Sequence, residues 1–384
     1  MTRARSRTGL LALLWMLIAC RESPSKNAVI LRHGAPPNQA GSVAKVPAHP
    51  EPSPTPAHPS SANPAVLLSW SAQSNVGRRP LQRSVQAVWK RLGSMDDTLL
   101  IQPINMFADS TALLLTDHAN AKLVALSLAD GARLWAAGSL GSGPKEWRGP
   151  LAIAGRHEGS IAVWDQTLRR VVLVSLDGTV LSSRSVPGVS ATGGMCIADG
   201  RRALLGLTGR DSSSLAFVDL ASAEVGEHIP LPWPAYRDVP SVGSQVVLGY
   251  AGGDCLIATL YGSGLARLSG HDGSIDTIAV VESVPLPVVE WRTTKWGRGI
   301  SLGKGTVNGV SAVARVADFV VVAFGGSSPQ RRRILDFYDW TTGRYEGSLI
   351  AQGDVESLAG IDDLLFMRTE DSSGFYRIDA VRIR

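Results

Sequence analysis

Three aspartates at the ends of strand-like apolar runs are the residues best placed, by type and spacing, to bind a ligand. Asp117, Asp165 and Asp219 close runs that are rich in Leu, Val and Ala. If these runs are corresponding strands of a repeated unit, the three carboxylates converge near a central channel, where they would bind a cation or a polar ligand. An Asp at a strand end also accepts hydrogen bonds from the backbone amides of the next turn. Repetition at a structural period favours this turn role over a channel site.

No catalytic or nucleotide-binding motif accompanies these acids. The chain has no Gly-x-Ser-x-Gly elbow, no His-Glu-x-x-His pair and no Asp-x-Asp-x-Asp-Gly calcium loop. The glycine-rich segment Gly297–Gly305 fails the phosphate-loop spacing and has Gly305 where Ser or Thr would bind magnesium. We therefore expect no catalytic residues and no cofactor, and the sequence assigns no metal ligands.

Aromatic and basic residues gather in a second candidate site, the segment Glu282–Gly309. Trp and Arg side chains are frequent anchors of protein interfaces, and long loops often carry function. The segment is predicted to bind a ligand or a protein partner. The alternative is a loop that covers a channel mouth or packs on a neighbouring unit. Its candidate contact residues are Trp291, Arg292, Lys295, Trp296 and Arg298.

Two cysteines, Cys196 and Cys255, lie in the apolar stretches GGMCIADG and GGDCLIATL. Neither has a Cys or His at metal-ligand spacing. Buried free thiols and a disulfide both remain open, and the apolar surroundings favour free thiols.

The elements that must position these residues form a repeat. LVALSLADGARLWAAG (123–138) aligns with VVLVSLDGTVLSSRSV (171–186), and each copy holds a strand, an Asp-Gly pair and a second strand. Gly131 and Gly178 are 47 residues apart. The Asp-Gly pairs supply the positive φ that a tight hairpin needs. Further copies lie at 215–231, 265–280 and 334–350, and a partial copy at 375–384.

A period near 45 residues, with about four strands in each unit, predicts an all-β chain folded as a six-bladed β-propeller. Ser84–Leu92 precedes the first full unit and could supply the strand that the partial last unit lacks, which would remove two exposed sheet edges. Gly273 and Gly343 are 70 residues apart, so Glu282–Gly309 is an insertion in the repeat. A pair of β-sandwiches is the alternative fold.

The first nineteen residues predict an export signal. Three arginines in the first seven residues precede the apolar run Leu10–Ala19, which is shorter than the ~20 residues that a membrane-spanning helix needs. Leu17–Cys20 (LIAC) resembles the lipobox of bacterial lipoproteins. The resemblance implies diacylglyceryl transfer to Cys20, cleavage after Ala19 and a membrane anchor through the lipid on Cys20. An ordinary signal peptide with a chance Cys is the alternative.

A Pro/Ala/Ser-rich tether is predicted to follow the lipid anchor. Ten of the 22 prolines lie between residues 24 and 64, and such a segment buries too little apolar surface to fold, so it acts as a spacer. The predicted domains are a lipoprotein signal peptide at 1–19, the tether at 20–84 and the β-propeller at 85–384.

The linker between the first two units, GSGPKEWRGP (141–150), carries a family resemblance. It resembles the segments that join blades in NHL-like six-bladed propellers of exported bacterial proteins, as do the strand end Trp164-Asp165 and the turn Leu168–Val171. The resemblance covers about 60 residues and implies a fold, because propellers host many activities. LADGARLWA (128–136) also resembles the tryptophan repeats of quinoprotein-like and outer-membrane assembly propellers, although one copy alone carries the Trp.

The charge balance excludes an extended nucleic-acid interface. The formal net charge is +5, and removal of the three signal-peptide arginines leaves +2. Binding to nucleic acid needs a dense basic face, and the short run Arg331–Arg333 is more typical of a solvated loop. We expect no nucleic-acid partner.

These observations predict a non-catalytic cell-envelope lipoprotein whose propeller binds an envelope or extracellular protein or another extracellular ligand. The alternative is a propeller hydrolase or lyase with a metal in the central channel. Arg21 follows Cys20, whereas resemblance to enterobacterial lipoproteins would place an Asp there for inner-membrane retention. We therefore expect the bacterial cell envelope and, within it, the outer membrane.

Overall fold

The chain folds into β-strands joined by short turns, as the repeat predicts. The computed structural model describes residues 77–93, 100–149, 151–189, 191–208, 213–294, 297–370 and 375–384. The predicted signal peptide, Cys20 and most of the tether lie outside these residues. Within them, one 3-10 turn at Pro234–Tyr236 accompanies 26 strands, and no helix has the length and apolar character to cross a membrane.

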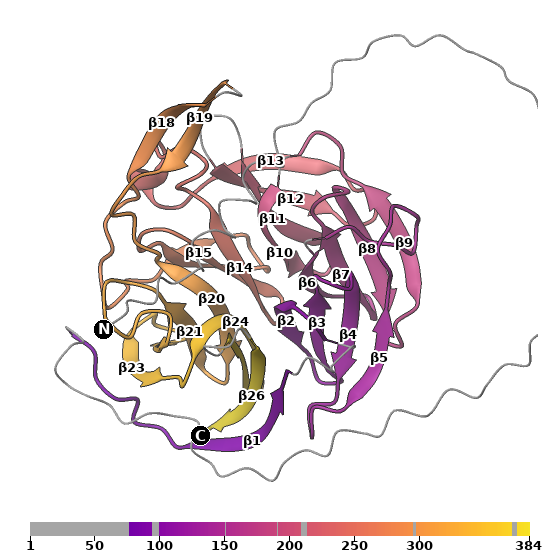
Figure 1. The fold of residues 1–384 in the computed structure, drawn as a ribbon, viewed down its shortest axis with the longest axis horizontal. Helices are drawn as coiled ribbons and strands as arrows, with labels where there is room; N and C mark the ends of the chain where they lie inside the picture. Colours follow the sequence, from indigo (N-terminus) through magenta and orange to yellow (C-terminus); the bar gives the residue numbers. More distant parts are fainter. Residues whose placement is uncertain are drawn as a thin grey trace, which may run out of the picture. The chain divides into compact units, whose positions relative to one another are not determined.

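Six four-stranded antiparallel sheets form the blades of a β-propeller, which confirms the predicted fold (Figure 1). The first three blades are consecutive meanders. Blade 1 contains β2 (Pro103–Ala108), β3 (Leu113–Asp117), β4 (Lys122–Leu126) and β5 (Arg133–Ala137). Blade 2 contains β6 (Leu151–His157), β7 (Ser160–Asp165), β8 (Arg170–Ser175) and β9 (Val180–Ser185). Blade 3 contains β10 (Ala191–Asp199), β11 (Arg202–Thr208), β12 (Ser213–Asp219) and β13 (Val225–Pro230).

Blades 4 and 5 are also consecutive meanders, whereas blade 6 takes its outer strand from the start of the propeller sequence. Blade 4 contains β14 (Val246–Ala251), β15 (Asp254–Thr259), β16 (Leu265–Leu268) and β17 (Ile275–Thr277). A separate hairpin, β18 (Val289–Thr294) and β19 (Gly297–Leu302), lies in sequence between blades 4 and 5 and pairs with no blade. Blade 5 contains β20 (Val310–Val316), β21 (Phe319–Phe324), β22 (Ile334–Asp339) and β23 (Tyr345–Ile350). Blade 6 contains β24 (Asp354–Ile361), β25 (Leu364–Glu370), β26 (Tyr376–Ile383) and β1 (Val85–Leu92).

The ring closes between the two ends of the propeller sequence. Strand β1 pairs antiparallel with β26, from Val85 opposite Ile383 to Leu92 opposite Arg377. This pairing confirms that Ser84–Leu92 supplies the outer strand of the last blade. This pairing covers the edge of β26, and β1 becomes the outer strand of the sheet.

The residues just before β1 also belong to the ring. The amide of Leu81 donates to the carbonyl of Ser348 at 3.0 Å, and the amide of Ser348 donates to the carbonyl of Arg79 at 2.8 Å. Residues 77–84, called the strap below, therefore lie along β23 of blade 5. The described propeller contacts begin at Gly77, eight residues before the predicted boundary.

Apolar side chains on both faces of each blade pack against the neighbouring blades. One core cluster joins Val321 and Phe337 of blade 5 to Leu365 and Val381 of blade 6, with each side chain at most 1% exposed. Another joins blade 6 to blade 1, through Phe366 and Leu115. Alternate residues of a strand point to opposite faces, which is why the blades need two apolar faces and show long apolar runs.

The Asp-Gly turns lie between the third and fourth strands of their blades, as predicted. Gly131, Gly178, Gly273 and Gly343 have φ between +68° and +90°. In blade 3 the corresponding residue is Ala223, at φ +59°. This turn therefore keeps the left-handed geometry without glycine, at a conformational cost of about 1 kcal/mol.

Two tryptophans connect these turns to the neighbouring blade. Trp89 in β1 donates its indole N–H to the carbonyl of Leu128 at 2.7 Å, and Trp135 in β5 donates to Leu176 at 2.8 Å. Each indole covers the glycine of the next blade's turn, Gly131 and Gly178 respectively. The contact between an outer-strand tryptophan and the turn of the next blade therefore occurs twice. Its second example, Trp89, lies in β1, the strand that closes the ring.

The two cysteines form a disulfide, so the expected free thiols were wrong. Cys196 in β10 bonds to Cys255 in β15, with the Cα atoms 5.9 Å apart. Both residues are fully buried between blades 3 and 4. The apolar surroundings that suggested free thiols are the core between these blades, into which both side chains point.

Candidate functional site

The Asp117 carboxylate binds backbone amides in the segment between β1 and β2, where the chain enters blade 1. Its carboxylate accepts the amides of Ile101 and Gln102, each at 2.9 Å, and the side-chain amide of Asn120 at 2.8 Å. The residue is fully buried at the end of β3, the second strand of its blade. These contacts fix the chain as it enters the inner strand.

Asp165 has the same role at the entrance to blade 2. It accepts the amides of Arg148 and Leu168, each at 3.0 Å, and Arg170 lies 3.7 Å away. Arg170 in turn donates to the carbonyls of Gly143 and Glu146. Asp165 and Arg170 thus hold the backbone of the linker that resembles those of NHL-like propellers. The residues that carry the resemblance therefore have a structural role.

Asp219 lies elsewhere, because it ends a third strand, β12. It accepts the amides of Ala221 and Ser222 at 2.9 and 2.7 Å. The hydrogen bond from the Ser222 amide is the main cause that lowers the pKa of this carboxyl. None of the three acids lines the channel cavity, so the channel site is corrected. Asp219 binds the amides of the turn that follows it, whereas Asp117 and Asp165 bind amides of the segments that enter their blades.

The channel is narrow and lined mainly by small or apolar residues of the inner strands β2, β6, β10, β14, β20 and β24 (Figure 1). Its cavity measures about 80 Å³. Gly194, Gly249, Ala312 and Ala359 contribute little more than backbone. The described residues contain no group of three His, Cys, Asp or Glu side chains that could hold a metal ion.

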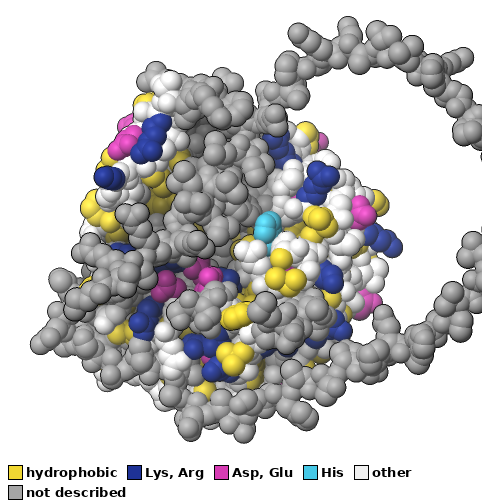
Figure 2. Space-filling model, in the orientation of Figure 1, with side chains coloured by type: hydrophobic (Ala, Val, Ile, Leu, Met, Phe, Trp, Pro, Cys, Tyr) yellow, Lys and Arg dark blue, Asp and Glu magenta, His cyan; other side chains and the backbone are white. Residues whose placement is uncertain are grey.

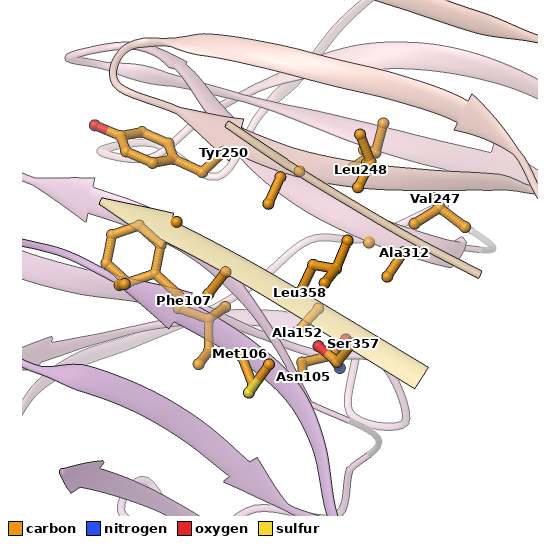
Figure 3. Close-up of a pocket in the computed structure, with 18 of the residues that line it drawn as sticks. Asn105, Met106, Phe107, Ala152, Val247, Leu248, Tyr250, Ala312, Ser357 and Leu358 are labelled. Atoms are coloured by element: carbon orange, nitrogen blue, oxygen red, sulfur yellow. The ribbon is translucent and has the colours of Figure 1, made fainter. Parts of the chain in front are cut away.

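The two ends of the channel differ in character. Phe107 and Tyr250 meet edge to face at one end, with ring centroids 5.2 Å apart, and Asn105 and Ser357 lie side by side at the other (Figure 3). Burial raises the pKa of the Tyr250 phenol, which therefore stays protonated at neutral pH. Polar chemistry in the channel is accordingly concentrated at the Asn105–Ser357 end.

Charged residues surround that polar end. Glu356 accepts a hydrogen bond from Arg332, which also lies 3.6 Å from Asp354. Arg368 in β25 is only 8% exposed, and its nearest carboxylate is that of Glu370, at 3.6 Å. No local sequence pattern points to this group, because Arg368 lies within an otherwise ordinary strand.

The hairpin β18–β19 projects from the ring beyond blades 4 and 5 (Figure 1). Trp291 is 58% exposed, and Leu286 and Val288 just before it are also exposed. Arg292 is exposed beside Glu290, at 3.3 Å. Lys295 and Trp296 lie outside the described residues, and Arg298 is described only in its backbone. Figure 2 shows hydrophobic surface beside basic side chains on this corner of the propeller.

Glu282, at the start of the predicted insertion, belongs to a different site. It pairs with Arg78 of the strap, which also binds Asp336. The strap therefore uses one end of the insertion as an anchor, while the hairpin forms its exposed part. Sequence reasoning missed Arg78 because it lies within the predicted tether, 20–84.

Comparison with known proteins supports the fold class and no particular family. No family model matches the chain, and no curated protein does. Among solved structures, a candidate exported protein from Bacteroides fragilis is 14% identical, with a TM-score of 0.52, covering 79% of this chain and 95% of its own. A member of the DUF4221 family from Bacteroides vulgatus is 10% identical, with a TM-score of 0.50, covering 80% and 99%.

A third similar structure, virginiamycin B lyase from Staphylococcus aureus, is 10% identical, with a TM-score of 0.47, and covers 78% of this chain and 99% of its own. WD40 repeats are also among the matches. At such identities the likeness shows a shared β-propeller and selects no activity. The class that fold and site define is a six-bladed propeller with a narrow channel and a projecting hairpin.

Proposed function

We propose that this protein is a non-catalytic, lipid-anchored envelope protein that docks an acidic partner protein through the β18–β19 hairpin. The observation that carries the proposal is the projecting hairpin with its exposed Trp291. None of the described residues of β18 and β19 belongs to a buried core cluster, and an exposed indole is a frequent interface anchor.

The positive charge of the segment that contains the hairpin favours an acidic partner. Between Ser283 and Gly309 the chain has four basic residues and a single acid, Glu290, so the segment carries a formal charge of +3. An apolar anchor with basic residues close to it in sequence steers an acidic partner and makes the association rate depend on salt. The described part of the docking surface consists of Leu286, Val288, Trp291 and Arg292.

Three observations support the envelope location. The LIAC sequence before Cys20 resembles a lipobox, and the Pro-rich tether gives reach from a membrane. The Cys196–Cys255 disulfide is typical of proteins in oxidising compartments. One similar structure is itself of a candidate exported protein. Cys20→Ala should release the protein from membranes, and an unmodified Cys20 in the mature protein would contradict the anchor.

The docking test compares Trp291→Ala with Leu181→Ala, which truncates an equally exposed side chain on blade 2 (58% and 59%). Partners are crosslinked in native envelopes, identified, purified and titrated against each variant. Trp291→Ala should weaken binding at least 10-fold, as hot-spot truncations do, and Leu181→Ala should leave it unchanged. Equal effects of the two variants would overturn the hairpin as the docking surface.

The charge test compares Arg292→Glu with Arg133→Glu, at an exposed arginine on β5. Reversal at Arg292 should slow association and reduce its salt dependence, with Arg133→Glu as the matched control. A partner surface that is basic, or an association rate independent of salt, would contradict the acidic partner.

A further inference from the structure

A groove separates the outer edge of blade 4 from a turn of blade 5. One wall consists of Asp276 and Thr277 at the end of β17 and of Ile278 directly after it, and the other wall is the turn 340–343. The volume of the groove is about 320 Å³, whereas that of the channel is about 80 Å³. The groove is therefore the larger of these two cavities, and it lies outside the ring of inner strands.

Tryptophans fill the equivalent space at two other junctions between blades. Trp89 in β1 covers Gly131, and Trp135 in β5 covers Gly178. The outer strand of blade 4, β17, has the sequence IDT and so contains no aromatic residue. The turn glycine of blade 5 faces Ile278 instead, which lies 3.4 Å from the position of a Cβ on that glycine. An isoleucine is smaller than an indole, and the groove is the space that it leaves.

The polar groups of the groove also suit an indole, which has one N–H donor and no acceptor. Arg267 donates to the carbonyl of Trp340 at 2.7 Å, and this carbonyl corresponds to that of Leu128, which accepts an indole N–H in blade 1. Arg267 also donates to Oδ2 of Asp276 at 2.9 Å. The Asp276 side chain is 61% exposed, so its second oxygen is the acceptor that the groove offers.

The chain itself supplies a tryptophan within reach. Gly77 lies against Val281, since a Cβ on Gly77 would be 3.6 Å from the Val281 side chain. Val281 is three residues beyond Ile278, and Trp70, outside the described residues, is seven residues before Gly77. Seven extended residues span about 23 Å, and three span at most about 11 Å. Trp70 can therefore reach the groove from the point where the strap begins.

The sequence around Trp70 differs from the Pro-rich part of the tether. Residues 65–76 (AVLLSWSAQSNV) contain no proline and no charged residue, and three aliphatic residues come just before Trp70. Apolar side chains of this kind gain free energy when they leave water. The strap that follows already lies along blade 5, so an attached segment at the groove would continue an existing interface.

We propose that the groove between blades 4 and 5 binds the Trp70 indole of the same chain. The ring packs on Ile278 and the turn 340–343, and its N–H is donated to Asp276. The contact repeats between blades 4 and 5 the tryptophan contact that joins two other pairs of blades. The free spacer then ends at Pro64, twelve residues before the strap begins, and the proposal goes beyond the function proposed for the hairpin.

The test labels the purified chain, with its tether, with 5-fluorotryptophan and follows Trp70 by ¹⁹F NMR. Trp70→Phe identifies the signal by its disappearance. A free peptide of residues 65–76 provides the reference for an undocked Trp70, and a soluble gadolinium chelate measures exposure through relaxation. In the wild type the Trp70 signal should be displaced from that of the peptide, and the chelate should relax it several-fold less.

Two substitutions at the ends of outer strands locate the contact. Thr277→Arg, at the exposed last residue of β17, places a long side chain in the groove. It should return the Trp70 signal to the position and the chelate sensitivity of the free peptide. Ser185→Arg, at the exposed last residue of β9 in blade 2, is the matched control and should leave the signal unchanged.

Three outcomes would overturn the proposal. The first is a wild-type Trp70 signal at the position of the free peptide, and the second is a displaced signal that Thr277→Arg does not move. The third is a displaced signal that returns to the peptide position on dilution, which would identify Trp70 of a second copy as the occupant. None of these results bears on the hairpin.

Discussion

The guanidinium of Arg78 and the carboxylate of Asp336 form a fully buried ion pair. Nε lies 2.9 Å from Oδ1 and Nη2 lies 2.8 Å from Oδ2, and neither side chain is exposed. Ser348 donates a further hydrogen bond to Asp336 at 2.5 Å, and Arg78 stacks on Phe324 with its Cζ 4.8 Å from the ring centre. This pair fastens the strap to blade 5 at the point where the described chain begins.

Removing one partner of the pair should be strongly destabilising. Arg78→Ala leaves Asp336 buried without its cation, and such losses cost about 3–5 kcal/mol. Arg79→Ala, next in sequence but 61% exposed and 4.0 Å from Glu346, should cost under about 1 kcal/mol. Urea unfolding of both variants measures the difference, and similar losses would show that the buried pair does not hold the strap.

Truncations should separate the strap from the closing strand. A chain that starts at Gly77 keeps the strap and β1 and is the reference for the other two. A chain that starts at Val85 loses the strap and the Arg78 pair, so its melting temperature should fall by several degrees while the ring stays closed. A chain that starts at Gly93 lacks β1, exposes the edge of β26 and should aggregate. Light scattering and thermal unfolding check all three, and equal behaviour of the last two would argue against closure by β1.

Gly178 should tolerate alanine less well than Gly188. Both have a strongly positive φ, +90° and +77°, so alanine is strained at either position by about 1–2 kcal/mol. A Cβ at Gly178 would lie 2.8 Å from the Trp135 ring, whereas a Cβ at Gly188 meets no atom within 4 Å. The extra loss for Gly178→Ala should be about 1–3 kcal/mol, measured by denaturant unfolding. Equal losses would mean that the indole moves aside freely.

The turn aspartates should make stability fall in acid. Asp339 accepts the Thr342 hydroxyl and the amides of Thr342 and Thr341, which lower the pKa of its carboxyl, the hydroxyl contributing most. Because the folded pKa lies below the unfolded value near 4, the stabilisation is present above that value and is lost as the pH falls through the folded pKa. The stability difference between wild type and Asp339→Asn should therefore shrink from pH 7 to pH 3.

Loss of the Cys196–Cys255 bond should destabilise the interface of blades 3 and 4. The two cysteines are 59 residues apart in sequence, and disulfides closing such loops contribute about 2–4 kcal/mol. The Cys196→Ala/Cys255→Ala variant in buffer and the wild type unfolded in reductant should both show this loss. Two free thiols per unfolded, unreduced chain would contradict the bond.

Local signals and the repeat predicted the blades and the ring closure, whereas side-chain contacts between distant segments escaped prediction. Gly131 and Gly178 were recognisable because a tight hairpin requires positive φ, and β1 because a partial last unit needs an outer strand. The Arg78–Asp336 contact spans 258 positions, and no local pattern at Arg78 distinguishes it from the tether before it. Asp219 was grouped with Asp117 and Asp165 because each follows an apolar run. The sequence pattern does not distinguish the end of a second strand from the end of a third strand. The Cys196–Cys255 bond and the position of Arg368 opposite Ser357 depend on how strands and blades align. That alignment is not encoded in any local sequence pattern.

The pairing of β1 with β26 makes the order of synthesis matter. Of the propeller's strands, β1 is the first to leave the ribosome and β26 the last, so the earliest strand waits unpaired until β26 is made. A chain that stops before Tyr376 ends with two unpaired strand edges, those of β1 and β25. Premature termination or proteolytic loss of β26 thus leaves unpaired backbone groups exposed, which proteases and chaperones can recognise. Closure of the ring is therefore possible only after the whole propeller sequence has been synthesised.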